Sequence, residues 1–459
     1  MVKLYPNVEF VLLTLIANRS QRGAFKYELP ENLTEVHEVY LNDLDWNAQK
    51  KTHKRTKLSK KELAALRSLI FNENVDWDTL FALFARKDIF VNSLLMGADF
   101  LTVATEYYET YYYNVTFADF LWTLRSIYLP LFIVLKSQIP EADLYHCVST
   151  GYAGILGCMG QYFHNGKLLV SEHGLYTRER EEELIKADWI GNTYRSIWIQ
   201  QFKKMSKVAY DRADLVTCLY AYARKLQIEL GCPEDKIRIT PNGIAVSRME
   251  NIPEKTEEDI PYINIGAILR VAPIKDVKTL IQAFTHAKQE RDDLKLWIMG
   301  PWEEEPEYAE ECFQMVSASG VKDIIFTDRV DVSQYLGRMD MTILTSISEG
   351  QPLTVLEGFA ARKPAICTDV GCCRELLYGN NDGFGSAGIL THIMDVDEIA
   401  QAILTLAGNP ELRKQMGENG YQRVNAVYHI ENMKAQYLQI YQDFCKDVGK
   451  TWPTEDFTI

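Results

Sequence analysis

The sequence is poor in several features that would assign it to a simple class. No glycine precedes Gly23, and no two of the nine cysteines stand in a CxxC spacing. An odd number of cysteines without such pairs argues against a disulfide framework or a structural zinc site and favours a reducing cytoplasm. Acidic residues outnumber basic ones, 63 to 49, which argues against a general nucleic-acid binder with a basic surface. Any anionic ligand must therefore be bound by a local group of cations.

Long apolar runs are also scarce. Residues 121–135, LWTLRSIYLPLFIVL, contain Arg125 and Pro130 and fall short of the ~20 residues that a spanning helix needs. Residues 1–17, MVKLYPNVEFVLLTLIA, are shorter than a span and lack a small-residue cleavage site, so we interpret them as a strand. Neither segment predicts a membrane anchor.

The pattern along the 459 residues predicts an α/β protein with two doubly wound halves. From residue 143 onwards, short aliphatic runs alternate with longer amphipathic ones, as in βα units of a parallel sheet. The polar residues 248–262 interrupt this series and are interpreted as a linker. We therefore predict a first domain at 1–247, a second at 263–430, and a C-terminal helix and tail at 431–459 that can pack back on the first domain. Ligands in such sheets bind beyond the carboxyl ends of the strands.

The string SEGQPLTVLE is the first candidate site. Pro352 suits the first turn of a helix, so the amides before and after it are free to bind phosphate at the helix N-terminus. Glu349 can accept hydrogen bonds from sugar hydroxyls, and Glu357 lies further along the helix. Two glutamates eight residues apart are common by chance among 63 acidic residues. The residues predicted to bind the donor here are Gly350, Gln351, Pro352, Leu353 and Glu357.

Arg270 and Lys275 stand in one loop between a strand and a helix, in LRVAPIKDVKTLI. Two cations at the carboxyl end of a strand can neutralise a leaving diphosphate. An Arg and a Lys five residues apart are more often ordinary surface charges. The SEGQPL loop in the same domain favours the functional interpretation.

A second group of candidates lies in the first domain. His173 follows the strand KLLVS, where a neutral imidazole can donate to or accept from a sugar hydroxyl. A histidine held by the backbone of a tight turn is an equally good interpretation. Glycines at 151, 154, 157 and 160 form a small-residue stripe, typical of a helix packed close to its sheet. Further candidates for lining a cleft are Glu172, Ser149, Thr150, Gly151, Arg178 and Asn242.

Three acidic triplets imitate a metal-binding DxD motif, but none follows a convincing strand together with other ligands. We therefore interpret all three as structural and predict no metal. They are Asp43-Leu-Asp45, Asp76-Trp-Asp78 and Asp395-Val-Asp397.

The strings VSEHGLYTREREEE, ITPNGI, LRVAPIKDVKTLI and SISEGQPLTVLEGFAARKPAICTDVGCCRELL resemble PelF-type glycosyltransferases of family 4, over residues 8 to 445. This resemblance implies the GT-B fold, in which two Rossmann-like domains face a cleft. It also implies a retaining transferase that uses a UDP-hexose without a metal. By position, Arg270 and Lys275 would hold the diphosphate, and Glu349 and His173, the catalytic candidates, would face the sugar. Glu357 would contact the ribose.

Three departures from the pattern accompany the resemblance. Relatives open with a strand and a Gly-rich loop that are not recognised here, Leu269 stands in place of a glycine, and Arg362 replaces a glycine in a turn. A non-catalytic subunit that binds nucleotide sugar or acts as a scaffold is therefore the alternative to the transferase, while a sugar-nucleotide epimerase has no specific support.

The resemblance also implies partners and a location. We expect a UDP-hexose donor, a saccharide acceptor in exopolysaccharide synthesis, and no nucleic acid. A membrane polysaccharide synthase complex is a further expected partner. The expected location is the cytoplasm, peripheral at the inner face of the membrane.

Overall fold

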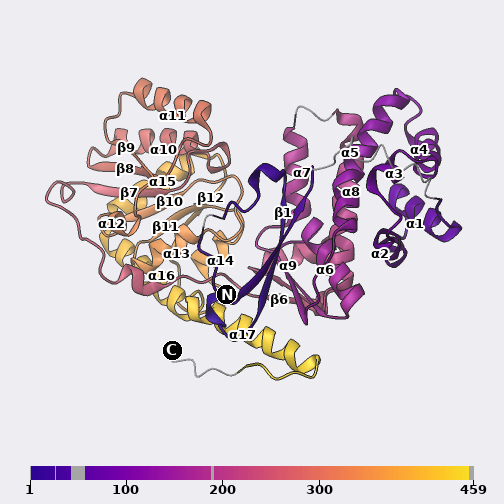
Figure 1. The fold of residues 1–459 in the computed structure, drawn as a ribbon. Coiled ribbons are helices and arrows are strands. Elements are labelled where there is room, and N and C mark those ends of the chain that lie inside the picture. Colours follow the sequence, from indigo (N-terminus) through magenta and orange to yellow (C-terminus); the bar gives the residue numbers. More distant parts are fainter. Residues whose placement is uncertain (1, 26, 43–56, 188–190, 454–459) are drawn as a thin grey trace. The chain divides into compact units, whose positions relative to one another are not determined.

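The computed structural model describes residues 2–25, 27–42, 57–187 and 191–453, and the chain divides into two compact units (Figure 1). Unit 1 consists of Met1–Cys218, Lys225–Arg238 and Gln439–Ile459, and unit 2 of Leu219–Arg224 and Ile239–Leu438. The units are defined by contacts within the chain, and the domain limits given above stay a prediction.

The parallel strands of unit 1 form two sheets, one of order β1-β2 and one of order β3-β4-β5-β6. The helices α1 to α5 stand between these two sheets in the sequence. The elements are β1 (Phe10–Ile16), β2 (Leu33–Tyr40), α1 (Lys60–Phe71), α2 (Trp77–Ala85), α3 (Val91–Leu95), α4 (Ala98–Tyr111), α5 (Phe117–Lys136), β3 (Leu144–Cys147), α6 (Gly151–His164), β4 (Lys167–Ser171), α7 (Tyr176–Lys186), α8 (Asn192–Arg212), β5 (Leu215–Cys218), α9 (Ala221–Glu229) and β6 (Ile237–Ile239).

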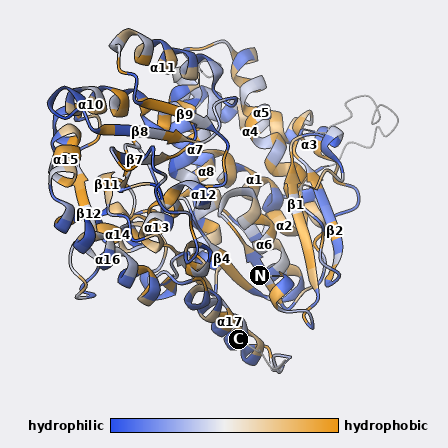
Figure 2. Ribbon diagram, turned by 90° about the vertical axis from the view of Figure 1, so that its left-hand side faces the viewer, coloured by the Kyte–Doolittle hydropathy of each residue, from blue (hydrophilic) through white to orange (hydrophobic). Residues whose placement is uncertain are grey.

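The predicted N-terminal strand is confirmed but is shorter than the apolar stretch. Residues Val2–Leu4 form a 3₁₀ turn, and β1 begins at Phe10. Figure 2 shows β1 as hydrophobic along most of its length, although its seven residues are only partly buried or exposed. Leu13 and Leu15 pack on the core of unit 1, whereas Leu12 is 36% exposed.

Helix α5 is a core helix of unit 1. It alone among the described helices is long and apolar enough to cross a membrane by length and composition. It has 20 residues, so the expectation that this stretch is too short was wrong. More than half of its most apolar window is buried inside the protein. Arg125 within it is buried and donates from Nε to the carbonyl oxygen of Leu95 at 3.0 Å.

The glycine stripe lies on α6, as the sequence predicts. A Cβ atom at Gly157 would lie 2.4 Å from Sγ of Cys147 in β3 and 2.6 Å from Cδ1 of Leu168 in β4. A Cβ at Gly160 would meet the ring of Tyr145 at 2.4 Å. These glycines therefore allow α6 to lie directly against its sheet, closer than any larger residue would permit.

Unit 2 contains one parallel sheet of six strands in the order β12-β11-β10-β7-β8-β9. The sequence predicts strands at INIGAI, KLWIMG, IIFT, MTILTS and PAICTDV, and helix starts near Val277, Pro306, Pro352 and Cys372. All of them occur, with shifts of one or two residues at their ends. The elements are β7 (Ile263–Ile268), α10 (Val277–Glu290), β8 (Leu294–Met299), α11 (Pro306–Ser319), β9 (Ile324–Asp328), α12 (Ser333–Leu336), β10 (Met341–Leu344), α13 (Leu353–Ala360), β11 (Ala365–Thr368), α14 (Cys373–Tyr378), β12 (Gly388–Thr391), α15 (Val396–Gly408), α16 (Pro410–Ala426) and α17 (Ile430–Asp447), of which α17 continues into unit 1.

The polar stretch 248–262 is anchored to unit 2. Asp259 is fully buried and forms a two-pronged ion pair with Arg338, at 2.7 Å to Nε and 3.2 Å to Nη2. Such paired hydrogen bonds between a carboxylate and a guanidinium fix the relative orientation of both groups. The segment therefore has a defined position on unit 2.

Candidate functional site

The strand order of unit 2 reverses between β7 and β10, and this is where the candidate site lies. The chain continues from β7 to β8 and β9 on one side, and from β10 to β11 and β12 on the other. Such a switch point leaves room for a ligand beyond the carboxyl ends of the two neighbouring strands. The loop after β7 carries Arg270 and Lys275, and the loop after β10 carries Glu349.

Hydrogen bonds join these two loops. The N–H of Ile347 donates to the carbonyl of Ile274 at 2.9 Å. The hydroxyl of Thr345 donates to the carbonyls of Lys275 and Asp276, at 3.1 and 3.3 Å. The position of each loop therefore depends on the other, although 70 residues separate Thr345 from Lys275.

The Glu349 carboxylate and the Lys275 ammonium form the centre of the site. Oε1 of Glu349 accepts from Nζ of Lys275 at 2.5 Å and from Oγ of Ser346 at 2.6 Å. The Glu349 and Lys275 side chains are 11% and 19% exposed. Partial burial strengthens such a charge-assisted pair while leaving part of each group open to a ligand. Ser346 was not among the residues predicted from the sequence.

Arg270 has a different partner from Lys275. It forms an ion pair with Glu304, in the loop after β8, and both side chains are 53% exposed. The carboxylate of Glu349 thus contacts only one of the two predicted cations. An exposed pair such as Arg270–Glu304 is weak and can open when a stronger anion binds.

Helix α13 begins at Leu353, one residue after the predicted start, with Pro352 as its N-cap residue. The N–H groups of Gly350, Gln351 and Leu353 donate no hydrogen bond to any part of the chain that the structure describes. Gly371, with φ of 54°, packs against this tip, because a Cβ there would lie 2.3 Å from the carbonyl oxygen of Gly350. The tip therefore offers free donors at the positive end of a helix dipole.

The Gln351 side chain binds the main chain of Asn242. Its Oε1 accepts from the N–H of Asn242 at 2.8 Å, and its Nε2 donates to the carbonyl of Asn242 at 3.1 Å. The Gln351 side chain therefore connects the α13 tip to the Pro241-Asn242-Gly243 turn.

Glu357 lies within α13. Burial raises the pKa of its carboxyl, and the charge of nearby Arg248 opposes that shift. The residue is five positions after Pro352 and eight after Glu349, and α13 begins between the two glutamates, at Leu353.

In unit 1, Glu172 is the acceptor of a buried network. Its carboxylate accepts from the hydroxyls of Thr150 at 2.9 Å and Tyr210 at 2.5 Å, and from Nε2 of Gln227 at 3.0 Å. Glu172 is 3% exposed and Thr150 has no exposed surface. Burial raises the pKa of Glu172, while the three hydrogen bonds oppose the shift. These contacts join β4 to α6, α8 and α9, and they occupy both oxygens.

His173, the next residue, has the opposite environment. Its side chain is exposed and forms no hydrogen bond or ion pair with any other described residue. Desolvation lowers its pKa, which favours the neutral imidazole. Among the remaining candidates of unit 1, Arg178 is exposed, Ser149 donates to the carbonyl of Thr150 at 3.2 Å, and Gly151 faces the ring of Tyr176.

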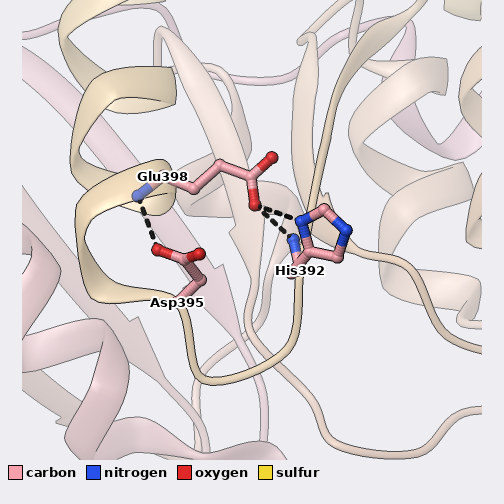
Figure 3. A group of neighbouring side chains, drawn as sticks. All are labelled: His392, Asp395 and Glu398. Carbon is pink, nitrogen blue, oxygen red and sulfur yellow. Dashed lines mark hydrogen bonds and ion pairs between the residues drawn. The ribbon is translucent and has the colours of Figure 1, made fainter.

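Two of the three acidic triplets begin helices. Asp76 accepts from the N–H of Thr79 as the N-cap of α2, and Asp395 accepts from the N–H of Glu398 as the N-cap of α15. Figure 3 shows Glu398 in turn accepting from the N–H and Nδ1 of His392. These three side chains stand close enough for a cation, but exposed groups that bind each other in this way need none. The triplet at 43–45 lies outside the described residues.

Comparison with known proteins agrees with this geometry. Residues 248–423, which hold the Lys275–Glu349 pair and the α13 tip, match the model for Glycosyl transferases group 1. Residues 248–423 thus form a Glycosyl transferases group 1 domain, and the parallel sheets agree with the GT-B fold. Residues 1–235, just over half of the chain, match the model Domain of unknown function (DUF3492). The chain belongs to that family.

Individual relatives are distant. The chain is 23% identical over 321 residues to the MMP alpha-(1->4)-mannosyltransferase of Mycolicibacterium hassiacum, covering 67% of this chain and 72% of that protein. It is 30% identical to the N-acetyl-alpha-D-glucosaminyl L-malate synthase of Bacillus anthracis, over 42% of this chain and 48% of that protein. The crystal structure of Anabaena HepE in complex with UDP and glucose superposes with a TM-score of 0.53 at 18% identity, covering 65% of this chain and 77% of that one. This last likeness confirms the predicted fold.

Proposed function

We propose that the protein is a retaining, PelF-type glycosyltransferase that transfers a hexose from a UDP-sugar to a saccharide acceptor in exopolysaccharide synthesis. One observation carries the proposal: Lys275 and Glu349 meet at the switch point of unit 2, beside a helix tip with free N–H groups. A cation and a helix N-terminus suit a diphosphate, and a carboxylate suits sugar hydroxyls.

In this proposal the donor's diphosphate binds Lys275 and the N–H groups of Gly350, Gln351 and Leu353. Negative charge develops on the diphosphate as the bond to the sugar breaks, and these groups stabilise it. Arg270 joins them once its exposed pair with Glu304 opens. Because Lys275 and the helix tip supply positive charge, we propose that a metal is not required.

The two glutamates have separate roles. Glu349 accepts hydrogen bonds from hydroxyls of the donor sugar, and Glu357 contacts the ribose. We propose attack on the same face from which UDP leaves, through an oxocarbenium-like state, so Glu349 forms no covalent bond. The neutral imidazole of His173 contacts the transferred sugar. The bound UDP and glucose in Anabaena HepE support a nucleotide-sugar donor.

Partners and location complete the proposal. The sequence resemblance supports a saccharide acceptor, a membrane polysaccharide synthase complex and a place in the cytoplasm at the inner face of the membrane. The acceptor chemistry follows from the same resemblance, as no residue at the site distinguishes one saccharide from another.

The test is UDP release from UDP-glucose, UDP-N-acetylglucosamine and UDP-N-acetylgalactosamine, each with and without EDTA. Lys275→Ala and Glu349→Ala should each lower the rate at least ~100-fold, the size expected when a stabilising charge is removed. Lys278→Ala is the matched control, because Lys278 is a nearby lysine whose partner is the exposed Glu311. UDP binding without turnover, on any of the three sugars, would favour the non-catalytic subunit instead.

A further inference from the structure

Ser346 is a buried hydroxyl directly beneath the proposed sugar-binding carboxylate. It has no exposed surface, and its Oγ donates to Oε1 of Glu349 at 2.6 Å. Its carbonyl accepts from the hydroxyl of Thr368, at the end of β11, at 2.6 Å. Ser346 is therefore fixed to the neighbouring strand and cannot itself contact a ligand.

The two donors to Glu349 both bind the same oxygen. Lys275 and Ser346 approach Oε1, whereas Oε2 accepts no hydrogen bond from any other residue within the described ranges. One oxygen is thus held by the protein and the other stays open. Without Ser346, only the flexible ammonium of Lys275 would define the orientation of the carboxylate, and that ammonium is also the proposed diphosphate ligand.

We infer that Ser346 is a positioning residue, which holds the Glu349 carboxylate so that Oε2 points to a hydroxyl of the donor sugar while Lys275 turns to the diphosphate. The inference rests on the proposed function and deepens it. It assigns recognition of the sugar to a Ser346–Glu349 unit and recognition of the diphosphate to Lys275. Losing one hydrogen bond to a charged group corresponds to about a tenfold change in an equilibrium or a rate.

The experiment compares Ser346→Ala with the wild type in two assays. Calorimetry measures the affinity for UDP and for UDP-glucose, and kinetics measures kcat and KM for UDP release. Ser346→Ala should bind UDP within about twofold of the wild type, because the diphosphate ligands remain. Its preference for UDP-glucose over UDP should fall about tenfold, and kcat should fall by a similar factor.

Two further variants distinguish a positioning role of Ser346 from a merely structural role. Thr342→Val removes a buried hydroxyl from the same stretch, in β10, at nearly constant shape, and should leave both assays unchanged. Ser346→Ala should add nothing to Glu349→Ala in a double-mutant cycle, because the serine acts only through that carboxylate. A merely structural role would give additive losses and a parallel loss of UDP affinity, and either result would overturn the inference.

Failure of the proposed function can be told apart from failure of this inference. If the wild type releases no UDP, the transferase proposal fails, and calorimetry still decides whether Ser346 controls the sugar contact. If the wild type turns over and Ser346→Ala equals it in both assays, the positioning role is wrong although the function stands.

Discussion

The two units differ in how far the charged side chains at the ends of their strands are buried. In unit 2, Lys275 and Glu349 pair with each other at the carboxyl ends of two strands and remain partly exposed. In unit 1, two neighbouring residues just before α7 differ: Glu172 is a buried acceptor, whereas the ring of His173 is exposed. At these strand ends unit 2 leaves a charged pair partly open to a ligand, whereas unit 1 encloses its carboxylate among its own donors.

Buried polar groups in unit 1 extend beyond Glu172. Lys204 in α8 is 8% exposed and donates to the carbonyl of Leu69 in α1 and to the hydroxyl of Tyr128 in α5, at 3.1 Å in the second case. His146 in β3 bonds the hydroxyls of Ser171 and Tyr441 at 2.8 Å each. These contacts show that stability in unit 1 depends on satisfied polar atoms as well as on apolar packing.

The largest expected effect tests this difference in unit 1. Glu172→Ala leaves the donors of Thr150, Tyr210 and Gln227 without their common acceptor, so unit 1 should lose ~3–5 kcal/mol of unfolding free energy. Amide hydrogen exchange, followed by mass spectrometry, would show faster exchange in α6 and α8. Glu304→Ala in unit 2 is the control, with an expected loss below ~0.5 kcal/mol. Equal losses in the two variants would remove the contrast between the units.

A second test breaks the packing of unit 1 without changing its charge. Gly157→Ala places a methyl against Cys147 and Leu168, and should cost ~2–3 kcal/mol by overpacking. Gly191→Ala, where a Cβ meets nothing within 4 Å, is the control. It should cost less than ~1 kcal/mol, the small loss expected when alanine replaces glycine at the N-cap of α8. Thermal unfolding of the two variants measures the difference. A stable Gly157→Ala protein would mean that α6 can move away from its sheet.

Acid should affect the two units differently, because the pKa of His146 in unit 1 is lowered and the pKa of His392 in unit 2 is raised. Burial lowers the pKa of His146 to about 4, so between about pH 6.5 and 4 the unfolded chain binds a proton that the folded chain does not. Unit 1 should therefore lose stability as the pH falls through that window, by about 3 kcal/mol. Glu398 raises the pKa of His392 in unit 2. The stability that this exposed ion pair contributes is therefore present below pH 6.5 and is lost as the pH rises through the raised pKa.

Hydrogen exchange at pH 7 and pH 5 would measure this effect separately in each unit. His146→Gln, which cannot take up a proton, should reduce the pH dependence of unit 1. If exchange in the strands β3 and β4 has the same pH dependence in both proteins, the buried histidine is not the cause.

The smallest expected effect has the opposite sign. Burial lowers the pKa of Lys204 to about 7, so at neutral pH part of the population carries a buried charge, and no carboxylate among the described residues pairs with it. Lys204→Met keeps the volume and should stabilise unit 1 by about 1 kcal/mol near pH 7. Above pH 7 the wild-type lysine is increasingly neutral when folded, so the advantage of methionine should shrink. Urea unfolding at pH 6.5 and pH 9 measures both values.

Much of unit 2 could be predicted from the sequence, because its strands are continuous apolar runs between polar turns. Ile263–Ile268 was predicted without error, and the start of α13 was off by one residue because Pro352 serves as the N-cap. Arg362 replaces a glycine in a turn of the family pattern, and the structure agrees with that pattern. The φ of Arg362 is 58°, a conformation that glycine adopts most easily. The stack of Arg362 on the ring of Tyr421 and its pair with Glu418 accompany this strained turn.

The remaining features depend on contacts between distant residues. Gln351 and Asn242 are 109 positions apart, and nothing in either motif indicates that one side chain would bind the other's main chain. Glu172 belongs to a loop motif, so its burial could not be inferred without knowing that α8 and α9 supply donors. Ser346 was open to prediction, since it lies two residues after the apolar strand β10, but the oxygen that it binds depends on the geometry of the loop.

The cysteines have a practical consequence for experiments on this protein. Eight of the nine are buried, and only Cys445 in α17 is partly accessible. Thiolate formation and access control reaction with maleimides. A maleimide dye added under native conditions should therefore attach at Cys445. The natural sequence thus already provides a specific site for a fluorescent label on α17.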